Sequence, residues 1–256
     1  MVWWMILIVI GFLAVHLFKM ARLYLVLMEH KISFGRFILL YIRTTFINLI
    51  IPFKLGEVYR VEEIARETKV WQVGLLSVLV DRYFDMTALL LLLVPFDLYF
   101  NRSLSSITTV LLILIAVVAL LYTTIPPSYA YMNRYLIMKK SSARSMAALR
   151  SLDVIKKWYD FTKNLITGRS YLIVLASLLG WVSEVVTLKA LATVWKGTFQ
   201  LRDFALYIKA IFMNGDSLIL TTYEGMAGAV FLALTVLGYA LYFILRAVKK
   251  AGKDKS

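Results

Sequence analysis

Long apolar runs, separated by short polar or charged segments, repeat along the whole chain. A helix that crosses a membrane needs roughly 20 consecutive, mostly apolar residues. Several runs reach that length, so the pattern predicts an all-α, polytopic membrane protein that forms a single integral membrane domain over residues 1–256. The seven apolar runs cover residues 2–18, 34–53, 71–96, 105–125, 171–195, 204–220 and 223–245.

The second apolar run ends in a break that is rich in charge, between Asn48 and Arg60. Pro52 removes a backbone donor and breaks a helix, and Gly56 permits a sharp turn of the backbone. Glu57 and Arg60 are three residues apart and share a face of the helix that follows. Charges at a broken helix are tolerated at membrane depth only inside protein or beside a wet cavity. The break therefore predicts a polar site, and an ordinary cytoplasmic loop is the alternative.

The third run carries Asp81, Arg82 and Asp85 among leucines and valines. The two carboxylates lie on one face of a helix, where they repel each other unless a cation sits between them or one is protonated. Arg82 is rotated from Asp81 by about 100°, so we expect its partner on another element. Charged residues inside spans are functional by default. The alternative is a buried ion pair that only fixes helix packing.

The amino-acid composition indicates a membrane protein and argues against several kinds of site. Of all residues, 61% are hydrophobic and 17% are charged. Soluble domains contain fewer hydrophobic and more charged residues, so this composition is typical of a membrane protein. The chain has no cysteine and two histidines, so we expect no disulfide, no metal and no cofactor. The net charge of +14 is better explained by cytoplasmic loops near anionic lipid than by nucleic acid, which we do not expect as a partner.

The basic segments cover residues 19–36, 128–169 and 246–256, whereas the connections 97–104 and 196–203 carry only one and two basic residues. If all seven runs crossed the membrane, either orientation would place basic segments outside, against the positive-inside bias. If 34–53 and 203–222 instead enter and return as re-entrant hairpins, every basic segment lies in the cytoplasm. This predicts about five full crossings, an N-terminus outside, a C-terminus in the cytoplasm, and an internal-repeat arrangement of two broken helices in the cell (inner or cytoplasmic) membrane.

The longest polar segment, 128–169, has nine Lys or Arg against Asp153 and Asp160. Apolar residues recur in it near helical spacing, which predicts an amphipathic helix on the cytoplasmic surface. We expect the span before it to end at Pro126 and Pro127. The tail, 246–256, is predicted to be a basic cytoplasmic segment.

Two motifs resemble a known family. The chain is similar to the flippase-like transmembrane domain of lysylphosphatidylglycerol synthases, as a stand-alone member without the aminoacyl-transferase domain. The resemblance implies two re-entrant segments that meet near the bilayer midplane and a role in moving lipids between leaflets. The second motif keeps Glu224 but lacks the family's proline and paired glycines. The first comprises Asn48, Pro52, Lys54, Gly56, Glu57 and Arg60, followed by Asp81, Arg82 and Asp85.

We therefore expect a lipid flippase or transporter that moves an anionic phospholipid or a polyprenyl-phosphate-linked lipid. One alternative is a membrane enzyme for glycosyl or phosphoryl transfer to a lipid-linked substrate, although no motif for a nucleophile or a nucleotide-sugar site supports it. Another is an accessory subunit, and a lipid-modifying enzyme is a possible partner in either case. The expected substrate groove is lined by Arg43, Lys54, Glu57, Arg60, Asp81, Arg82, Asp85, Glu184, Asp216 and Glu224.

Overall fold

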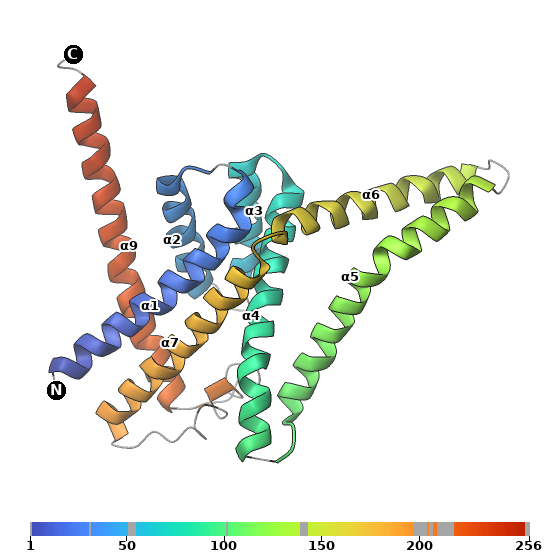
Figure 1. Cartoon of the computed structure of the whole chain (residues 1–256). Helices are drawn as coiled ribbons and strands as arrows, with labels where there is room; N and C mark the ends of the chain where they lie inside the picture. The colour runs from blue at the N-terminus through green and yellow to red at the C-terminus, as the bar shows by residue number, and fades with distance from the viewer. Residues whose placement is uncertain are drawn as a thin grey trace.

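A computed structural model describes residues 2–30, 32–50, 55–100, 102–138, 143–196, 204, 207–208 and 218–253. Across these residues the chain is helical, as the apolar pattern predicted, with eight α-helices and one short 3₁₀-helix (Figure 1). They are α1 (Val2–Leu27), η1 (Met28–His30), α2 (Phe34–Ile50), α3 (Leu55–Thr68), α4 (Trp71–Phe100), α5 (Ser106–Met138), α6 (Ala143–Ile166), α7 (Ser170–Lys196) and α9 (Leu218–Lys253).

Helices α1 and α7 lie side by side and form the centre of the molecule, with α4 against them (Figure 1). Gly11 makes this packing close, because a Cβ at that position would overlap the side chain of Thr187. Buried Val26, Phe84 and Ile173 join α1, α4 and α7 in one apolar cluster. Helix α1 runs on to Leu27 instead of ending near residue 18, so it carries nine more residues than the first apolar run predicted.

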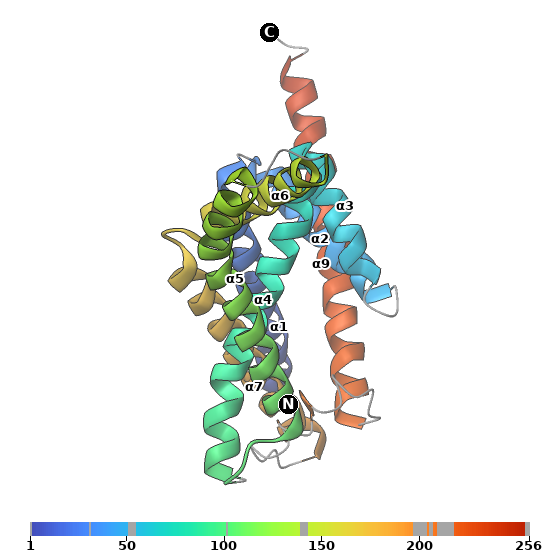
Figure 2. The ribbon, with the colours of Figure 1, turned by 90° about the vertical axis from the view of Figure 1, so that its right-hand side faces the viewer.

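The first expected hairpin, predicted within 34–53, is formed differently: residues Phe34–Ile50 are the single helix α2, and α3 (Leu55–Thr68) is the second arm. Helix α2 runs from the end of the molecule where α6 lies and ends about halfway along the height, and α3 runs back towards that end (Figure 2). Gly56 does not form the turn that we expected, because it is buried within α3. A Cβ there would overlap Asn48 of α2, so this glycine allows the two helices to pack closely. Pro52 and Lys54 lie outside the described residues.

The second expected hairpin is different. Glu224 and Gly225 lie within α9, which is one continuous helix, so the turn expected at these two residues does not occur. Without the family's proline and paired glycines, nothing in this stretch stops a helix, because a single internal glycine costs only about 1 kcal/mol. Most of 203–222, including Asp216, lies outside the described residues.

Helix α5 passes through Pro126 and Pro127 and continues to Met138, although we expected the prolines to end it. A proline either breaks or bends a helix, and here α5 bends away from α4 towards the far end of α6 (Figure 1). Helix α6 lies across the end of the bundle; in it Leu152 and Leu165 are buried, whereas Lys157 is exposed.

Within the part of the chain that the structure describes, four helical segments are long and apolar enough to cross a membrane, which indicates a multi-pass membrane protein. Helix α4, with 30 residues, runs beside them and carries the charges at 81, 82 and 85. The connection between α4 and α5 lies at the opposite end of the molecule from α6 (Figure 1), in agreement with the charge pattern. The number of crossings and the orientation of the termini stay predictions. The four segments are Trp3–His30, Ser106–Met138, Ser170–Val194 and Gly225–Ile244.

Candidate functional site

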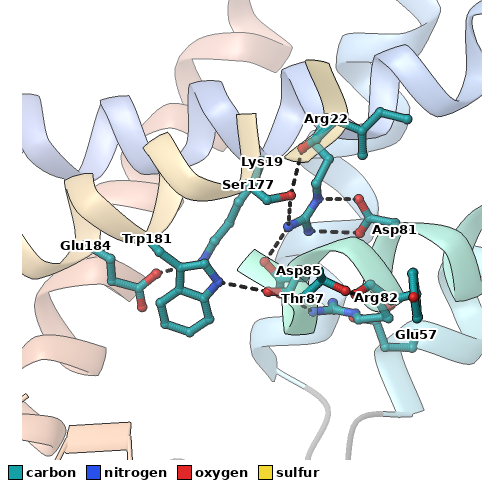
Figure 3. A network of polar contacts seen from close by, with 12 residues as sticks. Lys19, Arg22, Glu57, Asp81, Arg82, Asp85, Thr87, Ser177, Trp181 and Glu184 are labelled. Carbon is teal, nitrogen blue, oxygen red and sulfur yellow. Dashed lines mark hydrogen bonds and ion pairs between the residues drawn. The ribbon is translucent and has the colours of Figure 1, made fainter. Parts of the chain in front are cut away.

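Arg22 of α1 is buried between the two carboxylates of α4 (Figure 3). Its Nε donates to Oδ1 of Asp81 at 2.6 Å and its Nη2 donates to Oδ2 of the same residue at 3.0 Å. Its Nη1 donates to Asp85 and, at 3.4 Å, to Oγ of Ser177 on α7. Of the two alternatives that the sequence left open, a cation between Asp81 and Asp85 or a protonated carboxylate, the structure shows the cation: Arg22 forms a bidentate, charge-assisted pair with Asp81 and also contacts Asp85.

Arg82 links α4 to the re-entrant hairpin. Its Nη2 pairs with Oε1 of Glu57 on α3, and its Nη1 lies 3.6 Å from Oδ2 of Asp85. The expectation that Arg82 finds its partner on another element is confirmed. Glu57 also lies 3.5 Å from Nη1 of Arg60, one turn along the same helix. Because Glu57 contacts both arginines, the position of α3 against α4 depends on this carboxylate.

A third contact joins α1 to α7. Nζ of Lys19 lies 3.2 Å from Oε2 of Glu184, and the hydroxyl of Tyr207 donates to Oε1 of the same carboxylate at 2.6 Å. Together these contacts define what we call the charge cluster. In the described part of the chain it comprises the bases Lys19, Arg22, Arg60 and Arg82 and the acids Glu57, Asp81, Asp85 and Glu184.

A polar cavity of about 170 Å³ lies inside the charge cluster. All four bases of the cluster line it, whereas Asp81 is the only acid in its described lining. The other acids of the cluster are absent from this lining and pair with bases that belong to it. The cavity therefore presents mostly cationic donors, which suit an anion such as a phosphate. Its lining comprises His16, Lys19, Arg22, Leu23, Tyr41, Thr45, Asn48, Arg60, Asp81 and Arg82.

Arg60 is the most weakly bonded base in this lining. Its Nη2 lies 3.4 Å from Oγ1 of Thr45, and its contact with Glu57 is an ion pair that lacks hydrogen-bond geometry. Its Nε is buried and has no hydrogen-bond partner among the described residues, and the same holds for Oδ1 of Asn48. Buried polar groups are normally paired. Arg60, with an unsatisfied Nε donor in the lining of a cationic cavity, is therefore the base on this side that can turn to a ligand.

An apolar groove of about 600 Å³ runs between α1, α2 and α9 and meets the polar cavity. His16 and Tyr41 line both spaces, and Nδ1 of His16 lies 3.2 Å from the hydroxyl of Tyr41. Exposed Ile10 and Leu17 lie along the groove, so it opens to the surroundings of the helices. An apolar groove and a buried set of cations thus adjoin each other at His16 and Tyr41.

The structure brings most of the predicted site residues together and separates the others. Arg43 lies apart: its side chain is 50% exposed and pairs with Glu63 at 3.4 Å. Lys54 and Asp216 fall outside the described residues, as does the side chain of Glu224. The predicted residues that belong to the charge cluster are Glu57, Arg60, Asp81, Arg82, Asp85 and Glu184.

Sequence reasoning missed Lys19 and Arg22, which it counted among the basic residues that flank the first span. The sequence nevertheless contains a pattern that could have identified these two residues. His16, Lys19 and Arg22 follow one another at intervals of three, which places them along one helical face. The apolar residues then continue to Leu27, so the helix was long enough to bury that face.

The comparison with known families gives one result. The family model described as the lysylphosphatidylglycerol synthase TM region matches residues 1–237. No curated protein and no solved structure matched the chain. The matched region contains every residue of the charge cluster.

Proposed function

This chain belongs to the lysylphosphatidylglycerol synthase transmembrane family, and we propose that it is a lipid transporter that moves an anionic lipid between the leaflets of the cell membrane. The substrate would be a phospholipid or a polyprenyl-phosphate-linked lipid. The family is a membrane domain connected with lipids, which agrees with this proposal at a coarse level.

The observation that carries the proposal is the junction between the apolar groove and the cationic cavity at His16 and Tyr41. A ligand that fills both spaces must be amphiphilic, with an apolar chain and a polar, negatively charged head. A membrane lipid with a phosphate has that chemistry. Its chain would lie in the groove between α1, α2 and α9, and its headgroup would enter the cavity.

Within the cavity, the arginines would bind the phosphate. A guanidinium offers a planar fork of donors that matches a phosphate in a bidentate way. Arg60 has donors to spare, whereas Arg22 is committed to Asp81 and Asp85. Arg60 would therefore make the first contact with the headgroup, and Glu57 would hold Arg60 and Arg82 in place.

The depth of the cavity suits transport. Helix α2 ends about halfway along the molecule (Figure 2), and residues of α2 and α3 form one wall of the cavity. A headgroup bound there would have left the water on one side without reaching the other side. The chain can stay in lipid throughout, because the groove opens to the surroundings of the helices.

The test is lipid movement in liposomes that contain only the purified chain, with headgroup-labelled phosphatidylglycerol and a labelled polyprenyl-phosphate sugar in parallel. We expect transport by the native chain and its loss in Glu57→Gln and Arg60→Gln. Arg43→Gln is the matched control, because it removes the same charge from the same hairpin outside the cavity. If folded native protein moves neither lipid, the proposal fails, and the enzyme or accessory-subunit alternatives take its place.

A further inference from the structure

We propose a second lipid site on the other side of α4, where one anionic phospholipid is held as a structural ligand between α4, α5 and α6. Its acyl chain would lie in an apolar groove below α6, and its phosphate would bind Lys156 at the rim. The site is separate from the charge cluster, and it does not depend on the transport function proposed above.

The groove results from the way in which α5 is attached. At the connection between the two helices, Asp97 of α4 accepts hydrogen bonds from the backbone N–H of Ser105 at 2.8 Å and from the hydroxyl of Thr108 at 2.6 Å. From this fixed point α5 leans away from α4, and α6 closes the wide end (Figure 1). A wedge-shaped space therefore opens between the three helices.

Two apolar cavities occupy that space, one of about 360 Å³ and one of about 410 Å³. They share Leu76, Tyr122 and Thr162 in their linings, so they are parts of one groove. Each volume falls in the range of roughly 300–1,000 Å³ that is usual for small-molecule sites. If the groove were empty, its apolar walls would lose van der Waals contacts. In a membrane we therefore expect an alkyl chain of a lipid to fill it.

The groove also holds a polar group that suits a lipid better than a protein helix. The indole Nε1 of Trp158 is buried in this part of the fold and has no hydrogen-bond partner among the described residues. The ester carbonyls of a phospholipid are free acceptors, whereas the backbone carbonyls of a partner helix are mostly occupied by that helix. A small adjustment of the ring would let it donate to such a carbonyl.

A basic residue at the edge of the groove, Lys156, would favour a lipid with an anionic headgroup. Nζ of Lys156 lies over the ring of Tyr129, 4.7 Å from its centroid, and so stands between α6 and α5. No carboxylate pairs with it among the described residues, whereas its neighbour Lys157 pairs with Asp153 at 3.7 Å. Lys163 is seven residues further on and lies on the same stripe of α6. This stripe borders the apolar face, where a lipid phosphate above the groove would reach it.

The experiment uses the full chain in phosphatidylcholine vesicles with a small fraction of phosphatidylglycerol that carries a photoreactive diazirine on its acyl chain. After illumination, mass spectrometry maps the labelled peptides. We expect labels concentrated in residues 118–125 and 154–166, and loss of these labels in Thr162→Trp, which fills the groove. Leu120→Trp is the matched control, because Leu120 is exposed on α5 and does not line the groove.

A second pair of variants tests the headgroup without changing the groove. One surface cation contributes enough for about a fivefold change in affinity for anionic lipid. We therefore expect Lys156→Gln to lower the preference for labelled phosphatidylglycerol over labelled phosphatidylcholine about fivefold, and Lys157→Gln to leave it unchanged. Labels spread evenly over the exposed face of α5, equal labelling by both lipids, or crosslinks between two copies of the chain through this groove would each overturn the proposal.

Discussion

The charge cluster has two regions, one around Arg22 and one around Arg60. Both arginines are buried, but their hydrogen bonds differ in number and length. Around α1 and α4, Arg22 is 3% exposed and makes short, bidentate bonds to Asp81 with further bonds to Asp85 and Ser177. Around α2 and α3, Arg60 is 6% exposed, and its contacts are at 3.4–3.5 Å with one nitrogen unpaired among the described residues. The burial of a charge alone therefore does not reveal its role, whereas the completeness of its bonds separates a structural cation from one that is ready for a ligand.

The strongest way to break this comparison is Arg22→Met, which leaves two buried carboxylates without their cation. Removal of one partner from a buried ion pair costs about 3–5 kcal/mol, and we expect a loss of that size in the free energy of unfolding. The measurement is denaturant unfolding of the protein in detergent. The triple variant Arg22→Met/Asp81→Asn/Asp85→Asn should regain most of the loss, and a single variant as stable as the native chain would refute the structural role.

A somewhat smaller effect is expected at the α2–α3 crossing. In Gly56→Ala the new Cβ would overlap Asn48 and force the two helices apart, at a cost of about 1–3 kcal/mol. The same unfolding measurement applies. Gly225→Ala in α9 is the control, because a Cβ there meets nothing within 4 Å, and it should be neutral or stabilising by up to about 1 kcal/mol. Equal stability of the two variants would contradict the close packing.

Arg60→Gln tests the difference between Arg60 and Arg22 directly. We expect it to change the stability of the protein only slightly and to weaken ligand binding strongly. The contacts that it removes are long, so we expect a loss of about 1 kcal/mol or less in the free energy of unfolding. A hydrogen bond from a charged donor contributes about 1.5–3 kcal/mol, so binding of a phosphate headgroup should weaken roughly tenfold to a hundredfold. Titration with a soluble short-chain phosphatidylglycerol measures the affinity. Destabilisation as large as that of Arg22→Met would place Arg60 among the structural cations.

The smallest effect is expected from Arg43→Gln. Arg43 pairs with Glu63 with half of its side chain exposed, and it lies 5.7 Å from the centroid of the Tyr59 ring. Exposed ion pairs contribute about 0–1 kcal/mol. Stability and lipid transport should both stay close to native, as thermal unfolding and the liposome assay would show. A loss of transport would extend the binding surface beyond the cavity to the outer face of α2.

The sequence predicted those features that depend on local pattern. The apolar runs indicated the helical membrane fold, and the break before Glu57 indicated an interrupted helix, although not that 55–68 would be its second arm. The spacing of Asp81 and Asp85 indicated either a cation between them or a protonated carboxylate. Arg22 was missed because a base near the end of an apolar run is typical of membrane flanks. Its burial depends on α4 and α7, which lie far away in the sequence.

Other features depended on tertiary structure or on weak local signals. Pro126 and Pro127 are strong helix breakers in general, yet α5 continues through them, and beyond them Tyr129 lies under Lys156 of α6. Glu224 and Gly225 suggested a turn, but without a proline they lie in a helix. Neither apolar groove could be predicted, because each is formed by three different helices.

The balance of the charge cluster bears on how the protein responds to the membrane voltage. With four bases and four acids ionised, the described cluster carries no net charge. Movement of one elementary charge through the membrane involves about 2.3 kcal/mol per 100 mV. Displacement of a neutral cluster as one unit involves almost none of this electrical work. Any dependence of transport on voltage would therefore report the charge of the lipid headgroup itself.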